Sequence, residues 1–187
     1  MIDVRKSPTA TFLDLRQWLH DVNALDVVPA GANFPLLVQQ GSSLTEDGAM
    51  YVYGAGIHDK ACYLVGVPIA HVHRWDSEGS RDSSIASPTT LASATLNRLA
   101  REHWLYTKVA GDIPLTVSHI SAFLESFEGA YASASAYVVL AAESDPEPPA
   151  SIVDLQCMAF SSGDPLVMIG YHRSRLAQQI VRTAQIA

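Results

Sequence analysis

The sequence is poor in cysteine and has no long apolar run. Its two cysteines, Cys62 and Cys157, each lie in an apolar segment, where a thiol usually behaves as a small buried hydrophobic group. This favours a reducing compartment, although the sequence leaves open whether the two cysteines pair. No segment approaches the ~18 apolar residues that a membrane-spanning helix needs, and the first residues carry charges where a signal peptide needs an apolar region. We therefore expect a cytoplasmic protein with no membrane partner.

Basic residues are also few. The chain has 12 Lys and Arg against 19 Asp and Glu, a net charge of −7, so it has no excess of cations to neutralise phosphate groups. Nucleic acid is therefore not an expected partner. The phosphate-loop, dinucleotide-binding and nucleophile-elbow patterns are absent too. The sequence thus predicts no cofactor, and it leaves open whether the protein is an enzyme.

What the chain does have is apolar content: 48% of its 187 residues are hydrophobic, enough for one domain with a buried core. Serine followed by proline, at Ser7-Pro8 and Ser87-Pro88, predicts the starts of two helices, because serine caps a helix and proline suits its first turn. Apolar residues at helical spacing support these two helices and a third. The predicted helices are Pro8–Ala24, Pro88–Trp104 and a shorter one from Ser118 to just before Gly129.

Segments rich in Val, Leu, Ile and Tyr between turn residues predict strands. They are Pro35–Gln40, Ala49–Ala55, Ala61–Arg74, Ala130–Ala142, Ile152–Phe160 and Pro165–Tyr171. The strand that contains Pro68 is expected at a sheet edge or at a bulge, because proline has no amide donor. Residues 143–151 are acidic and proline-rich and predict a loop or linker, and apolar positions from Leu176 to Ala184 predict a closing helix.

The predicted element order is α-βββ-αα-βββ-α. Short turns between consecutive strands favour antiparallel pairing, and strands grouped apart from helices are typical of the α+β class. We therefore expect a single α+β domain, with a mainly antiparallel sheet and helices packed on one face of it.

The stretch GVPIAHVHRWDSEG, residues 66–79, holds the most suggestive polar residues. On a strand, His71 and His73 would point to the same face and could share a metal ion. Glu78 follows, and His119 could add a fourth ligand, so one hypothesis is a metal-dependent enzyme. A strand with one solvated face also carries polar residues at every second position. We adopt this simpler interpretation, which predicts no tightly bound metal.

Three stretches together resemble the chorismate lyase family and its ligand-sensing relatives, the UTRA domains. They are PLLVQQGSSLT at 35–45, DIPLTVSHI at 112–120 and SSGDPLVMIGYHRS at 161–174. The resemblance implies an antiparallel sheet that encloses a small aromatic acid, with Arg74 where the family holds the carboxylate. The glutamate of the lyases would fall at Gly170, so the resemblance implies ligand binding rather than lyase activity.

The leading functional hypothesis is the binding of a small organic ligand, such as an aromatic acid, between sheet and helices. Arg74 and Arg173 are the candidate ligand-binding residues, because a guanidinium can pair with both oxygens of a carboxylate. The simpler interpretation of both arginines is that they are solvated surface groups or ion-pair partners. The alternative functions are a protein-interaction or chaperone-like regulatory module, with a homodimer as one form of it, and the metal-dependent enzyme.

Overall fold

The computed structural model describes residues 10–23, 35–40, 48–127, 129–142, 148–159 and 165–172. Ser7, Pro8, Arg173 and the predicted closing helix lie outside these residues. The helices are α1 (Phe12–Asn23), α2 (Ile69–Glu78), α3 (Pro88–Glu102) and α4 (Val117–Glu125). The strands are β1 (Leu36–Gln40), β2 (Ala49–Ile57), β3 (Ala61–Pro68), β4 (Tyr106–Val109), β5 (Ser135–Leu140), β6 (Ala150–Ala159) and β7 (Pro165–His172). The predicted α+β class is confirmed.

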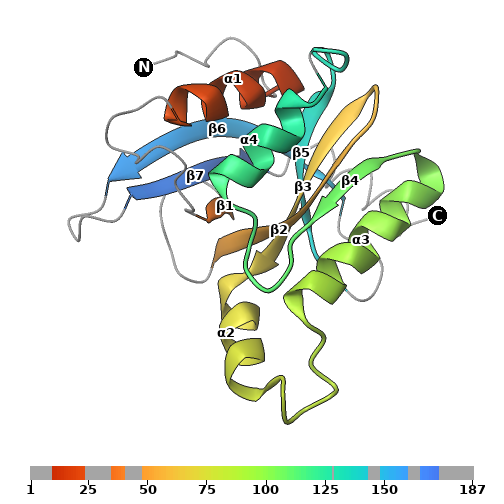
Figure 1. Ribbon diagram of the computed structural model, residues 1–187, viewed down its shortest axis with the longest axis vertical. Coiled ribbons are helices and arrows are strands. Elements are labelled where there is room, and N and C mark those ends of the chain that lie inside the picture. The colour runs from red at the N-terminus through yellow and green to blue at the C-terminus, as the bar shows by residue number, and fades with distance from the viewer. Residues whose placement is uncertain are drawn as a thin grey trace, which may run out of the picture.

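The strands form one curled, mixed sheet (Figure 1). Its order is β1-β7-β6-β5-β3-β2-β4, and β1 also pairs with β2, so six strands follow one another around a closed path. The hairpins expected from the short turns are present, because β1–β2, β2–β3 and β6–β7 are antiparallel. Two pairings, β1–β7 and β3–β5, are parallel. The sheet is therefore mostly antiparallel, but its closure depends on parallel neighbours that the sequence did not indicate.

Successive side chains of β3 are buried, so both faces of this strand are covered. It lies between β2 and β5 in the sheet, and helix α3 packs across β2 and β3. A Cβ atom at Gly54 would lie 3.0 Å from Cδ1 of Leu96, so this face of the sheet meets α3. A Cβ atom at Gly66 would instead meet Met50 of β2 and Val38 of β1, on the inner side of the curled sheet. The core thus fills both the interior of the curled sheet and the layer under α3.

Helix α1 begins later than predicted. Thr11 and Asp14 cap it reciprocally, because the Thr11 amide donates to Oδ2 of Asp14 at 2.8 Å and the Asp14 amide donates to Oγ1 of Thr11 at 3.2 Å. The amide of Ala10 donates to the carbonyl of Ile152 at 2.8 Å, which holds this residue beside the sheet. A helix that starts at Pro8 is therefore wrong, since residues 10 and 11 are not helical.

The predicted strand Ala61–Arg74 is wrong beyond Pro68, where α2 begins. The expectation of an edge strand at Pro68 is wrong as well, because β3 lies inside the sheet. The pairing of β2 with β3 does contain a register shift, but it lies between Val52 and Gly54 and not at Pro68. Proline is tolerated because it is the last residue of the strand and directly precedes the helix. Val72 is then buried while His73 and Arg74 are exposed, as expected for a helix with one apolar side.

Two further boundaries differ from the predictions. The strand expected over Ala130–Ala142 is confined to Ser135–Leu140, after a turn in which Gly129 has φ of 78°. Strand β4 was not predicted, because three of its four residues are exposed and no apolar alternation marks it. The expected loop 143–151 also ends earlier, because β6 starts at Ala150.

The cap predicted at Ser87 is confirmed, and it provides a test of helix stability. Oγ of Ser87 accepts a hydrogen bond from the Thr90 amide at 3.1 Å, and Pro88 occupies the first turn. Replacing Ser87 with Ala should lower the free energy of unfolding by about 1 kcal/mol, because one amide at the helix end loses its partner. Chemical denaturation measures this difference, and Ser87→Asp, which keeps an acceptor, should restore most of the loss. A Ser87→Ala protein as stable as wild type would contradict this role of the cap.

Candidate functional site

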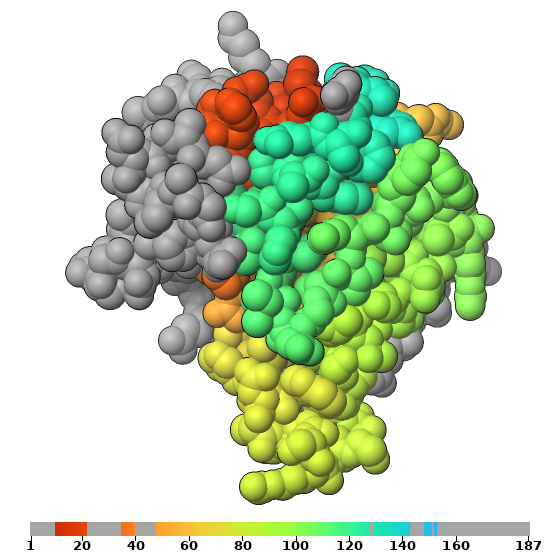
Figure 2. Space-filling model, in the orientation of Figure 1, coloured from red at the N-terminus to blue at the C-terminus, as the bar shows by residue number. Residues whose placement is uncertain are grey.

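A pocket of about 370 Å³ lies beside α2, the loop after it, the start of α3 and Ala142, two residues after the end of β5. This volume falls in the range of small-molecule sites. Helix α2 and the loop that follows it project at the lower end of the molecule in Figure 2. The pocket is lined by His71, Arg74, Ser84, Ile85, Ala86, Leu91 and Ala142.

His71 connects α2 to the loop. Its Nε2 lies 2.9 Å from the carbonyl oxygen of Ala86, and because a carbonyl can only accept, Nε2 must carry the proton and donate. In the neutral ring Nδ1 is then an acceptor. One histidine that lines the pocket therefore has a defined tautomer and a fixed orientation.

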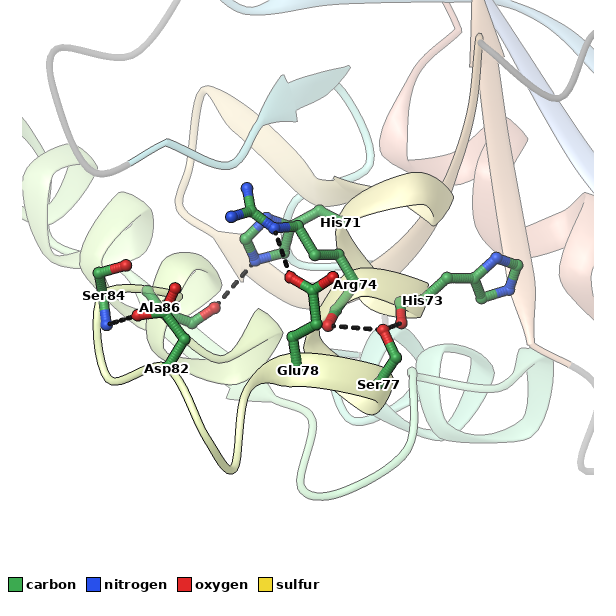
Figure 3. A network of polar contacts seen from close by, with 8 residues as sticks. All are labelled: His71, His73, Arg74, Ser77, Glu78, Asp82, Ser84 and Ala86. Atoms are coloured by element: carbon green, nitrogen blue, oxygen red, sulfur yellow. Dashed lines mark hydrogen bonds and ion pairs between the residues drawn. The ribbon is translucent and has the colours of Figure 1, made fainter.

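Arg74 contributes the cationic group of the pocket. Its Nε donates to Oε2 of Glu78 at 3.3 Å, and since both side chains are more than half exposed, this ion pair adds little stability. Hydrogen bonds from Ser84, and to a smaller extent the charge of Arg74, hold the pKa of Asp82 below its ordinary value. Figure 3 shows Arg74 and His71 on the side of α2 that faces Ser84 and Ala86. Neither Glu78 nor Asp82 lines the pocket.

Arg98 and Thr95, both on α3, position the Ala142 wall of the pocket. Nη2 of Arg98 donates to the carbonyl of Ala142, and the Ala142 amide donates to Oγ1 of Thr95 at 3.3 Å. Thr95 is buried, and its hydroxyl also donates to the Leu91 carbonyl at 2.9 Å. Sequence reasoning missed this pair. Two polar residues three positions apart on the buried side of a helix are the signal that could have found it.

The structure does not bring the four candidate metal ligands together. His71 and His73 lie on a helix, where residues two apart point to different sides, and Figure 3 shows His73 directed away from His71. Glu78 pairs with Arg74, and His119 belongs to the N-terminal cap of α4, where its Nδ1 accepts from the Thr116 amide at 3.4 Å. Within the residues described, no three His, Cys, Asp or Glu side chains are close enough to hold a metal ion. The strand geometry assumed for the histidine pair is wrong.

The other sequence-based candidates can be placed only in part. Arg74 lines the pocket, whereas Arg173 lies outside the described residues. Gly170, at the position of the lyase glutamate, lies in β7 and pairs with Gln39 of β1. Cys62 is a free, buried thiol, and burial raises its pKa to about 12. A thiol with so high a pKa is almost entirely protonated near neutral pH, which makes Cys62 a packing residue rather than a nucleophile.

Of the helices in the described part of the chain, none is long and apolar enough to cross a membrane. The pocket combines one arginine, one histidine and one serine with an apolar wall, and no acidic side chain of the described residues lines it. Comparison of the chain with models of known protein families, with curated proteins and with solved structures gave no match.

Proposed function

We propose that the pocket beside α2 and α3 binds a small organic anion, with an aromatic carboxylic acid as the favoured class. The observation that supports this proposal is the distribution of charge around the pocket. Among the described residues, the lining includes one cation, Arg74, and no carboxylate, although the chain as a whole is acidic. A local cationic site in an acidic protein favours an anionic ligand over a cationic one.

Arg74 is suited to hold the acid group. Glu78 occupies its Nε, and its two Nη groups make no hydrogen bond to the described residues. These two groups can pair side by side with both oxygens of a carboxylate. The hydroxyl of Ser84 offers a further donor, and the acceptor Nδ1 of His71 can accept only from a donor group of the ligand, such as a ring hydroxyl. Ile85 and Leu91 provide an apolar wall for a ring.

We also propose a ligand class and a second binding residue on the basis of the sequence. The resemblance to the chorismate lyase family and the UTRA domains favours an aromatic acid, and the glycine at the lyase glutamate position favours binding without lyase chemistry. Arg173 stays a predicted second ligand-binding residue. We also propose a cytoplasmic location, because the two cysteines lie in apolar segments and favour a reducing compartment. We propose no nucleic-acid partner, because the chain has a net charge of −7 and its few basic residues are scattered.

Calorimetric titration with benzoate and 4-hydroxybenzoate tests the proposal. Replacing Arg74 with Ala should weaken binding roughly 10- to 100-fold, because a charge-assisted hydrogen-bonded pair is lost. Replacing Glu78 with Gln removes the same ion pair but keeps the guanidinium, so binding should be retained or become tighter. Arg101→Ala, an exposed arginine outside the pocket, is the neutral control.

Benzamide serves as a ligand control, because it has the same ring and no charge. The proposal expects benzamide to bind much more weakly than benzoate. Equal binding of the two, unchanged binding by Arg74→Ala, or no binding of either acid by the wild-type protein would contradict it.

A further inference from the structure

The segment of the chain that contains β4 is rich in exposed apolar side chains. Four large hydrophobic residues are exposed in the described part of the chain, and three of them lie within ten residues: Trp104 at 71%, Tyr106 at 40% and Ile113 at 58%. The fourth, Leu13, lies on α1. Trp104 and Tyr106 are in contact with each other, and neighbouring exposed apolar groups indicate an interaction surface better than scattered ones do.

The aromatic rings beside β4 hold one another in place. Tyr106 contacts the ring of Trp104 edge to face, with ring centres 4.3 Å apart, and the ring of Phe127 at 5.2 Å. Phe127 in turn contacts Tyr131 at 5.5 Å. A surface whose rings are already packed loses little side-chain entropy when a partner covers it.

Strand β4 is also the last strand of the sheet and pairs only with β2 among the described residues. The amide of Ala110 donates to the Tyr53 carbonyl at 2.8 Å, in register with the β2–β4 ladder. Along an antiparallel strand, the backbone N–H and C=O groups of alternate residues point to the same neighbouring strand. The backbone groups of Lys108 and Tyr106 therefore also point toward β2. The backbone groups of Thr107 and Val109 therefore point away from the sheet and can bond to a further strand.

We infer that the partner at this edge is a second copy of the same chain, with the two β4 strands paired antiparallel across a two-fold axis. Hydrogen-bonded and non-hydrogen-bonded pairs alternate in such a ladder. The axis exchanges the two copies, so it passes between one residue of β4 and the same residue of the other copy, which pair with each other. Near the middle of β4, this residue is either Thr107 or Lys108.

The positive charge of Lys108 favours an axis at Thr107 over one at Lys108. An axis at Lys108 would place two ammonium groups directly opposite each other, which destabilises a ladder. An axis at Thr107 pairs two threonines, a favourable combination, and joins outward-pointing backbone groups on both strands. It also places Lys108 opposite Tyr106 of the other copy and diagonal to Trp104, so that the ammonium can lie over an aromatic ring. The edge is thus complementary to itself in this register.

Sedimentation of the full-length protein at increasing concentration tests the dimer. Wild type should sediment as a dimer at high concentration, and Thr107→Pro, which removes an outward amide, should raise the dissociation constant on the order of 100-fold. Proline is tolerated at an edge position, and circular dichroism checks that the variant is folded. Leu13→Ser, which removes the exposed hydrophobic side chain on α1, should leave the dimer unchanged. A wild type that stays monomeric, including at millimolar concentration, would overturn the inference, as would a folded Thr107→Pro variant that dimerises normally.

Cysteine cross-linking tests the register. Residues in a hydrogen-bonded antiparallel pair have Cα atoms about 5.5 Å apart, within disulfide reach. Thr107→Cys should therefore form a disulfide-linked dimer on mild oxidation, whereas Lys108→Cys should form much less, with wild type as the background control. Preferential cross-linking at Lys108→Cys, or none at either position, would overturn the assigned register. This inference does not depend on the ligand pocket, and neither test uses a ligand.

Discussion

Replacing Leu96 with Ala should lower the free energy of unfolding by about 3 to 5 kcal/mol. Leu96 is 2% exposed and lies on the side of α3 that packs on the sheet. Its two methyl groups approach the backbone of Gly54 and Gly56 of β2. Because the glycines have no side chain that could move into the space, the cavity left by alanine stays largely open, and both the lost burial and the cavity contribute to the cost.

Chemical denaturation followed by circular dichroism measures this loss. Leu13→Ala is the matched control, because Leu13 is a helical leucine that is 48% exposed, and its replacement should change the stability by less than about 0.5 kcal/mol. A loss below about 1 kcal/mol for Leu96→Ala would mean that α3 does not pack on β2 as described.

The second large effect is expected at Gly54. A Cβ atom there would lie 3.0 Å from Cδ1 of Leu96 but at ordinary distances from Ala92 and Val65. Leu96 is buried and has little room to move, so Gly54→Ala should destabilise the protein by about 1 to 3 kcal/mol. The control is Gly111→Ala, because nothing lies within 4 Å of a Cβ atom at Gly111, and its effect should be neutral or slightly stabilising.

The double variant Gly54→Ala with Leu96→Ala tests the contact between these two positions directly. In a Leu96→Ala background the close contact is gone, and the alanine at position 54 then only restricts the unfolded chain. Gly54→Ala should therefore become neutral or stabilising by up to about 1 kcal/mol in that background. Additive effects of the two substitutions would contradict the contact between Gly54 and Leu96.

Local signals in the sequence were sufficient for much of the fold. Ser87 and Pro88 mark the start of α3 because capping and the first helical turn depend on neighbouring residues. The hairpins follow from short turns between apolar segments, as between Ile57 and Ala61. The closure of the sheet could not be predicted in this way, because the parallel pairing of β1 with β7 joins segments more than a hundred residues apart.

The site was predicted only in part, and the reason lies at Pro68. The apolar alternation of β3 seemed to continue into Ile69, Ala70 and Val72, so the sequence placed His71 and His73 on one face of a strand. The change to a helix after Pro68 separates the two histidines and instead places His71 beside Arg74, one turn apart. Arg74 lines the pocket, and its predicted role in ligand binding stays a prediction, while the place of His71 beside it was not predicted.

The most direct test of the proposed ligand pocket is an NMR titration of the ¹⁵N-labelled full chain with benzoate. The proposal predicts saturable shifts of the amides of residues 71–74, 84–91 and 142, around the pocket lined by Arg74 and His71, and no such shifts in the Arg74→Ala variant. Absence of saturable shifts at millimolar benzoate, or shifts confined to other parts of the molecule, would contradict the proposal that this pocket binds an organic anion.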